Sequence, residues 1–418
     1  MRKLFVKLFV VLAALSVFPA HAQSGFDAWL AAFRQEASAQ GISTATLDAA
    51  LTGITPIERV VELDQRQPEF QQTFYEYLSR RVTAYRISRG GVLLQENSAL
   101  LDAVEQQYGV PKAVLVSFWG LETNFGKNLG SLNIPASLAT LAYDGRRSQF
   151  FRSQLLDALR IIDAGHVQAI DMNGSWAGAM GHMQFMPSTF RAYAVDGDGD
   201  GRIDLWNSIP DAMVSGANYL KRAGWRANEP VAREVRLPED FDFRQASAGY
   251  RLPVEKWTAL GVLTADATPL PSAAGDAAIL LPQGWQGPAF MVFDNFNVVM
   301  RWNRSVNYAL SVAQLAHQLA GGSALTVQGP ETGALSTAQL KALQQALNEM
   351  GYDAGPIDGL LGSQTQSAIR IYQAVYRLPA DGYPAPSLLA HVETQHAAAA
   401  AAGKLTGALV PTFSDPEE

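Results

Sequence analysis

Hydrophobic residues at helical spacing flank one segment whose sequence favours β structure. Residues 23–130 carry apolar side chains at helical spacing, and the same spacing returns at 305–319. Between them, at 226–300, proline and glycine separate short β-favouring runs such as 289–293. We therefore predict a mainly α fold: a helical domain with a subdomain of β-favouring sequence inserted into it.

The first 22 residues have the layout of an export signal. Positive charges on Arg2, Lys3 and Lys7 precede an apolar run, and small residues surround Ala22. We expect cleavage after Ala22 and a periplasmic location. No later run has the roughly 20 apolar residues of a spanning helix, and no cysteine could carry a lipid, so we expect no membrane anchor.

The 418-residue chain contains no cysteine, so its core must stabilise it without disulfides. Its length predicts two or three domains, and a hydrophobic fraction of 48% is typical of globular proteins. A formal net charge of -7 argues against nucleic acid as the main partner. We expect a monomer.

An apolar helix with one acid near its end is the first candidate site. The segment 111–126 reads PKAVLVSFWGLETNFG, and Glu122 lies among Phe118, Trp119 and Phe125. Apolar neighbours and the negative end of the helix dipole both disfavour the anion and raise the pKa of Glu122. A general acid working near neutral pH needs such a pKa. The alternative is a glutamate that simply surfaces at a helix end.

A second segment, 175–190, reads SWAGAMGHMQFMPSTF. Its small residues allow a ligand to approach the backbone closely, and Gln184 is a lone amide among methionine and aromatic side chains. Such an amide suits the N-acetyl or hydroxyl group of a sugar.

These two segments, followed by VDGDGDGRIDLW, ANYL and RWNRSVNYAL, resemble the lytic murein transglycosylase B family over about 26–318. The resemblance implies a lysozyme-like helical catalytic domain at 23–325, with 226–300 as its small inserted α/β subdomain. It also implies that Glu122 is the only catalytic residue and that the chemistry requires no cofactor.

The resemblance places further residues in a glycan-binding groove. Ser175 stands at the serine that hydrogen-bonds the acid in this family, and Gln184 at a groove glutamine. Tyr219 and Asn303 match other groove positions.

At three further matching positions the sequence does not decide how the residue contacts the substrate. Trp302 stands where the family has tyrosine, so we expect stacking on the sugar without a hydroxyl contact. Arg146 and Arg147 match a pair thought to meet the peptide stem, and a solvated surface pair is an equal alternative.

The activity implied is cleavage of the β-1,4 bond between N-acetylmuramic acid and N-acetylglucosamine of peptidoglycan in cell-wall turnover. The muramyl 6-hydroxyl attacks C1, which leaves a 1,6-anhydro end. A hydrolase of goose-lysozyme type is the enzymatic alternative, and a non-catalytic wall-binding scaffold is the other. Peptidoglycan strands are the expected partner, with other cell-wall enzymes as candidate protein partners.

The segment 196–207 follows the EF-hand pattern of calcium-binding loops. The predicted ligands are the side chains of Asp196, Asp198, Asp200, Asp204 and Asn207 and the carbonyl of Arg202. Asn207 replaces the usual bidentate glutamate, so affinity should be reduced. We predict a structural Ca²⁺ here, and an acidic glycine-rich turn without metal is the alternative.

Residues 336–392 resemble the peptidoglycan-binding domain of three-helix type, with turn motifs at Gly351-Tyr352 and Asp358-Gly359. A linker at 326–335 precedes this module. On its second helix we place Ala368, Ile371, Tyr372 and Val375 on one face. The end of the chain, 393–418, is predicted to be a disordered tail.

Overall fold

The computed structural model describes residues 20–65, 72–271, 275–330 and 333–405, with only the backbone of 20–24. The predicted export signal falls almost entirely on residues 1–19, outside the described residues. Within the described part, no helix is both long enough and apolar enough to cross a membrane.

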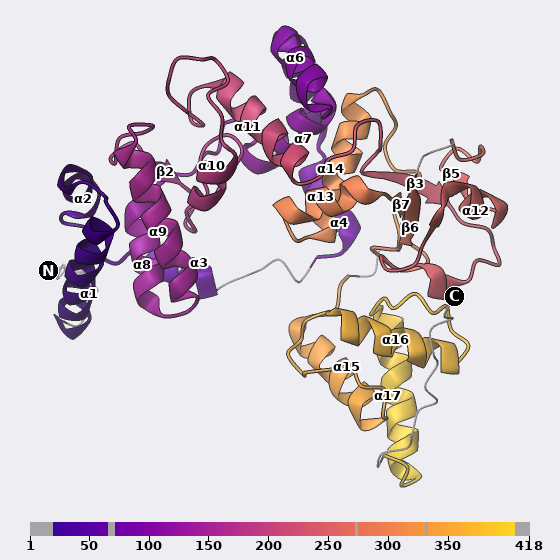
Figure 1. Cartoon of the computed structure of the whole chain (residues 1–418). Coiled ribbons are helices and arrows are strands. Elements are labelled where there is room, and N and C mark those ends of the chain that lie inside the picture. Colours follow the sequence, from indigo (N-terminus) through magenta and orange to yellow (C-terminus); the bar gives the residue numbers. More distant parts are fainter. Residues whose placement is uncertain (1–19, 66–71, 272–274, 331–332, 406–418) are drawn as a thin grey trace, which may run out of the picture. The chain divides into compact units, whose positions relative to one another are not determined.

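Helices dominate the chain, and the strands are short (Figure 1). The helices are α1 (Ala20–Ala39), α2 (Thr44–Leu51), α3 (Glu58–Gln65), α4 (Phe74–Arg81), α5 (Ala84–Glu96), α6 (Ser98–Tyr108), α7 (Lys112–Thr123), α8 (Ile134–Asp144), α9 (Ser148–Asp163), α10 (Pro187–Tyr193), α11 (Ile209–Arg222), α12 (Val254–Ala259), α13 (Asp294–Trp302), α14 (Val306–Leu319), α15 (Thr337–Glu349), α16 (Ser363–Val375) and α17 (Pro386–Ala401). The strands are β1 (Leu132–Asn133), β2 (Asn173–Gly174), β3 (Ala232–Arg236), β4 (Arg251–Pro253), β5 (Leu263–Thr264), β6 (Asp276–Leu280) and β7 (Ala289–Val292). The predicted mainly α fold with a small inserted α/β subdomain is confirmed.

The chain forms two compact units. Among the described residues, the first consists of 20–64 with 130–179 and 186–188, and the second of 65, 72–129, 180–185 and the described chain from Thr189 onward.

The first unit is built on the helix pair α8 and α9, which lie side by side (Figure 1). Asn133 caps α8 by accepting a hydrogen bond from the Ala136 N–H, and a proline stands in the first turn of the helix. The chain reverses between the two helices at Gly145 and Arg147, both of which have positive φ. Strands β1 and β2 pair antiparallel beside them.

The second unit surrounds α7, which packs against α5 and α14. Helix α7 is buried on all sides, which explains why its sequence is apolar without a polar stripe. The Arg86 guanidinium of α5 donates to the Gly120 carbonyl at 2.8 Å. A Cβ at Gly120 would lie 2.8 Å from the Phe125 ring, so only glycine fits there.

The inserted subdomain of this unit is a five-stranded antiparallel sheet in the order β4-β6-β7-β3-β5. Every residue of β7 is buried, as expected for the central strand of a small sheet. Helix α12 covers the sheet through Trp257, which is fully buried and donates from Nε1 to the Ala277 carbonyl at 2.8 Å.

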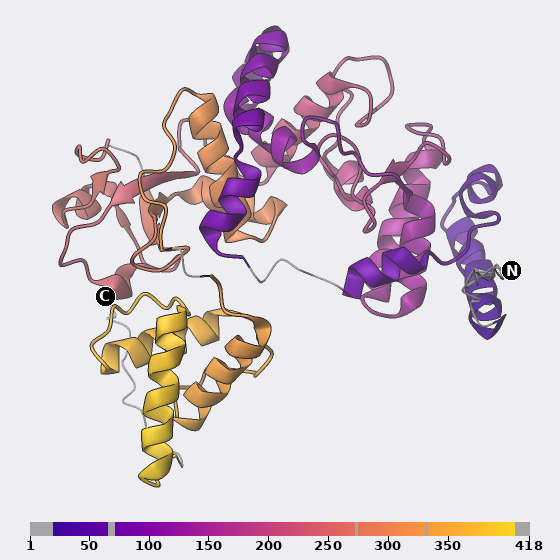
Figure 2. The same ribbon diagram turned by 180° about the vertical axis from the view of Figure 1, so that it is seen from behind.

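Helices α15, α16 and α17 pack on one another as the C-terminal module (Figure 2). Its turn at Asp358-Gly359 is held by the buried Gln344, whose Oε1 accepts from the Gly359 N–H and whose Nε2 donates to Asp358, both within 3.0 Å. Ala368 and Tyr372 are buried as predicted, but Val375 is 43% exposed, and Ile369 occupies the core instead.

The predicted disordered tail is wrong for residues 393–401. They continue α17 to Ala401, because a run of alanine has the highest intrinsic helix propensity. Residues 406–418 lie outside the described residues.

Candidate active site

Glu122 is the penultimate residue of α7, at the point where the helix stops abruptly. Asn124, Phe125 and Gly126 all have positive φ, at 51°, 62° and 83°. A Cβ at Gly126 would lie 2.2 Å from the His182 ring, which fixes glycine at this position. Thr123 donates from its hydroxyl to the His182 carbonyl at 3.1 Å, so the end of α7 is tied to segment 180–185.

Two donors meet on one oxygen of the Glu122 carboxyl group. The indole Nε1 of Trp302 donates to Oε1 at 3.0 Å, and the Tyr308 hydroxyl makes a short hydrogen bond to the same atom. Burial raises the pKa of Glu122, and these two hydrogen bonds oppose the rise without cancelling it. The predicted direction of the pKa shift is confirmed, with burial as its main cause.

Glu122 remains partly exposed, so the acid can reach a ligand. The positive charge of Arg81 also lowers the pKa of Glu122, by less than either hydrogen bond does. Burial and the nearby Glu122 carboxylate raise the pKa of Tyr308 well above its usual value, so its hydroxyl stays protonated and donates.

Aromatic rings surround the acid. Trp302 contacts Phe118, Phe185 and Tyr219 with ring centroids 4.4, 5.3 and 4.9 Å away. The Tyr219 hydroxyl donates to the Arg301 carbonyl at 3.0 Å, which fixes the ring. Such a wall can stack on sugar faces and lowers the local dielectric around the carboxyl group.

His182 is a supporting residue of this unit. Its Nδ1 accepts from the Trp119 indole at 2.8 Å, so a proton on the ring resides on Nε2. Burial lowers the pKa of His182, which keeps the ring neutral.

Gln184 and Asn303 lie in the same unit. The Gln184 amide donates to the carbonyls of Leu129 at 3.2 Å and Gly181 at 3.1 Å, and the residue has a φ of 48°. These two hydrogen bonds fix the orientation of the Gln184 side chain, which was predicted from sequence as a groove residue. Asn303 is the C-cap residue that follows α13, and it is exposed.

Ser175, Arg146 and Arg147 belong to the first unit. The Ser175 hydroxyl accepts from the Ala179 N–H at 2.9 Å and closes the loop between them. Both arginines bind the carboxylate of Asp64, a residue only 1% exposed. Burial alone would raise the pKa of Asp64, but the hydrogen bonds from the two arginines outweigh it and lower that pKa.

The acidic loop brings together a set of ligands different from the predicted one. Carboxylate oxygens of Asp196, Asp198 and Asp211 all lie within 4.8 Å of one another, and Asp211 was not among the residues predicted from sequence. Oxygen atoms 2.3–2.6 Å from a common centre, as around Ca²⁺, would have about this separation. The donor set therefore fits calcium.

Two of the predicted ligands, Asp204 and Asn207, are hydrogen-bonded to each other. Asn207 directs its amide N–H groups at Asp204, at 3.1 Å to Oδ2, and the Arg202 guanidinium bonds the same oxygen at 2.7 Å. An amide that donates in this direction does not present its oxygen to a metal, which explains the difference. Asp211 instead organises the loop by accepting from the Gly197 and Asp204 N–H groups.

The transglycosylase SLT domain family matches residues 25–317, which is most of the chain. The chain belongs to this family. A peptidoglycan binding domain family matches residues 336–391, so the SLT domain is followed by a second recognisable module. Both matches agree with the resemblances seen in the sequence.

A curated relative and several solved structures are similar to this chain. The curated membrane-bound lytic murein transglycosylase B of Escherichia coli is 32% identical over 250 residues, 58% of this chain and 66% of the relative, so the match spans just under two thirds of that protein. The crystal structure of SltB3 from Pseudomonas aeruginosa in complex with NAG-anhNAM-pentapeptide has 44% sequence identity to this chain and a TM-score of 0.85. The match covers 88% of this chain and 99% of the SltB3 chain. The calcium complex of the E. coli lytic transglycosylase Slt35 is 28% identical, with a TM-score of 0.60, covering 71% of this chain and 93% of its own.

Sequence reasoning missed Tyr308, Asp211 and Asp64. Tyr308 stands within the quoted motif RWNRSVNYAL, six residues after Trp302, so its place on the next helix was the available signal. Asp211 follows Pro210 beyond the twelve-residue loop and carried no signal of its own.

Proposed function

We propose that this protein is a lytic transglycosylase of the periplasm that cleaves the β-1,4 bond between N-acetylmuramic acid and N-acetylglucosamine. The observation that carries the proposal is the Glu122 carboxyl group, with a raised pKa and both donors on one oxygen. This arrangement leaves Oε2 as the atom that exchanges a proton with the substrate.

In the first step protonated Glu122 gives its proton to the bridging oxygen as the bond from that oxygen to C1 of the muramyl residue breaks. The raised pKa of Glu122 supplies this acid form near neutral pH. The aromatic wall around Trp302 stacks on the sugar and excludes water from the cationic C1, and the substrate's own N-acetyl group stabilises the positive charge.

In the second step Glu122 is a carboxylate, stabilised by the hydrogen bonds from Trp302 and Tyr308. It takes the proton from the muramyl 6-hydroxyl as that oxygen bonds to C1. The 1,6-anhydro ring closes and Glu122 is again protonated, so one acid serves both steps. Because the attacking group is intramolecular, positioning supplies part of the rate enhancement.

Mass spectrometry of muropeptides released from purified sacculi tests the proposal. Products lighter by one water than reducing-end muropeptides are expected. Reducing ends would instead identify a hydrolase, and the absence of any product would favour a wall-binding scaffold.

The remaining residues have proposed roles in binding. Gln184, Tyr219 and Asn303 contact the glycan, and Ser175 of the first unit is a further proposed substrate-binding residue. Arg146 and Arg147, held by Asp64 but 50% and 44% exposed in their side chains, keep N–H groups available for carboxylates of the peptide stem.

We propose that the acidic loop holds a structural Ca²⁺ through Asp196, Asp198 and Asp211. The calcium complex of Slt35 and the convergence of these three carboxylates support the proposal. Bound calcium would offset the mutual repulsion of the three anions and fix the loop.

Millimolar calcium should therefore raise the melting temperature. Asp198→Asn should abolish most of this shift, because it removes one charge from the trio. Asn207→Ala should keep the shift, because Asn207 faces Asp204. Differential scanning calorimetry measures both, and a shift lost in Asn207→Ala but kept in Asp198→Asn would reject the proposed ligand set.

We propose that the C-terminal module tethers the enzyme to the cell wall, which raises its local concentration on the substrate. The match to a peptidoglycan binding domain family supports this role.

A chain ending at Pro330 should keep its activity on soluble glycan chains but sediment several-fold less with intact sacculi. Ending there, rather than earlier, retains the hydrogen bonds of Thr326 and Val327 to Glu234. Equal sedimentation of the shortened and full chains would reject the tether.

A further inference from the structure

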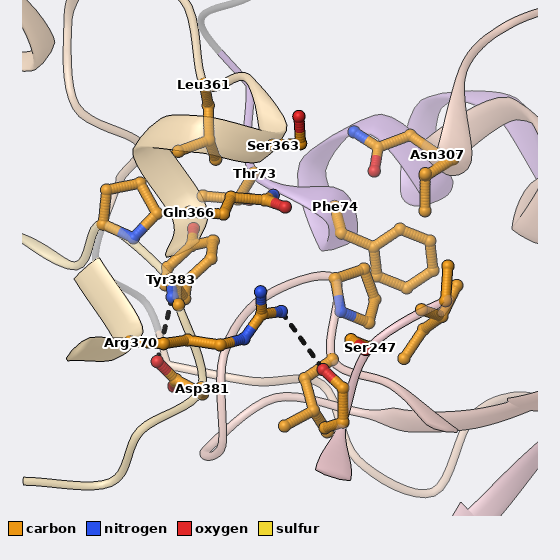
Figure 3. Close-up of a pocket in the computed structure, with 18 of the residues that line it drawn as sticks. Thr73, Phe74, Ser247, Asn307, Leu361, Ser363, Gln366, Arg370, Asp381 and Tyr383 are labelled. Atoms are coloured by element: carbon orange, nitrogen blue, oxygen red, sulfur yellow. Dashed lines mark hydrogen bonds between the residues drawn. The ribbon is translucent and has the colours of Figure 1, made fainter. Parts of the chain in front are cut away.

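A cavity of about 600 Å³ lies within the second unit, between the C-terminal module and the rest of that unit (Figure 3). Arg370 of α16 and Asp381 line one wall, and Thr73, Ser247 and Asn307 line the others. Among the described lining residues, Arg370 and Asp381 are the charged ones. The volume is within the range of ligand-binding pockets.

Three hydrogen bonds already engage the acid in this cavity. Asp381 accepts from Gln373 at 2.7 Å and from the N–H groups of Tyr383 and Trp285 at 2.9 and 2.8 Å. Its carboxylate is therefore used to hold the turn at 381–383 and to join it to the inserted subdomain.

The base in this cavity has donors left over. One terminal nitrogen of Arg370 donates to the Ala246 carbonyl at 3.2 Å, the dashed line that runs from the guanidinium in Figure 3. Its Nε is buried and has no hydrogen-bond acceptor among the described residues. The other terminal nitrogen makes no hydrogen bond to a described residue, so its N–H groups can meet an acceptor supplied by a ligand.

The guanidinium is also held in place. Gly382 has a φ of 74°, and a Cβ there would lie 3.0 Å from Nε of Arg370, so the backbone packs closely on the side chain. The two terminal nitrogens of a fixed guanidinium lie side by side and can bind a carboxylate with two parallel hydrogen bonds.

We propose that this cavity binds a carboxylate of the peptidoglycan peptide stem through Arg370. The inference rests on the proposed function for its substrate class. A peptide fits the lining, since amide and hydroxyl side chains such as Asn307 and Thr73 alternate with apolar ones such as Phe74. The site would let the module select glycan strands that still carry their peptides.

Calorimetry with the full-length protein tests the proposal, using a synthetic stem pentapeptide and the same peptide with every carboxylate amidated. The native protein should bind the acid form at least about tenfold more tightly than the amide form. Arg370→Met should weaken binding of the acid form by a similar factor, and Arg370→Lys by less, because lysine lacks the fork. Arg377→Met, an exposed arginine of the same module, should change nothing.

Equal binding of the two peptides, or none, would overturn the proposal even if Arg370→Met failed to fold. Binding that survives Arg370→Met and is lost in Arg146→Met would assign the peptide to the first unit and also overturn it. The anhydro product from peptide-free glycan strands is measured in parallel. If that product forms while the stem peptide fails to bind, the inference fails and the proposed function stands. If the stem peptide binds through Arg370 but no anhydro product forms, the proposed function fails and the binding site stands.

Discussion

Glu122→Gln should lower the rate of anhydro-muropeptide formation from sacculi by about 10²–10⁴-fold, the usual contribution of a positioned general acid. Glutamine keeps the size of the side chain and still accepts from Trp302 and Tyr308 through its amide oxygen. It has no proton to give to the bridging oxygen and cannot take one from the 6-hydroxyl. Both steps of the mechanism therefore fail together.

Two controls accompany this variant. Glu96→Gln, at the exposed end of α5, should leave the rate unchanged. The melting temperature of Glu122→Gln should not fall, because the substitution removes a carboxyl group whose ionised form burial disfavours. Anhydro product made by the variant at the native rate would remove Glu122 from the mechanism.

Tyr308→Phe should shift the pH profile of the reaction toward higher pH. The first step needs protonated Glu122, so activity is present below its pKa and is lost as the pH rises through it. The Tyr308 hydroxyl donates to the carboxylate and lowers that pKa. Without the hydroxyl the pKa of Glu122 rises further, and the alkaline limb of the profile moves upward.

The same variant should also be about 10- to 100-fold slower at its optimum, since a hydrogen bond to a charged group contributes about 1.5–3 kcal/mol. The measurement is the initial rate of anhydro-product release across the pH range. Tyr250→Phe, in the inserted subdomain, is the matched control and should change neither the rate nor the profile. An alkaline limb that stays in place in Tyr308→Phe would show that the tyrosine does not act on the acid.

Local sequence patterns predicted the features of this protein that depend on neighbouring residues, such as helices and turns. An apolar run with one acid before a glycine predicted both α7 and the raised pKa of Glu122, because helix burial and helix termination depend on neighbouring residues. The same reasoning located the glycine-rich turns and the inserted sheet. It assigned Val375 to a core face and residues 393–401 to a tail, since the short helical patterns there are ambiguous in phase and in length.

Only the tertiary structure decided which side chains meet. Trp302 and Tyr308 reach Glu122 from 180 and 186 residues away, and nothing in the local sequence fixes such a contact. Asp211 joins Asp196 and Asp198 because the chain folds back beyond the twelve-residue pattern, while the amide of Asn207 turns to Asp204. The sequence by itself determined the acid and its helix; the packing of distant helices determined the donors that set its pKa.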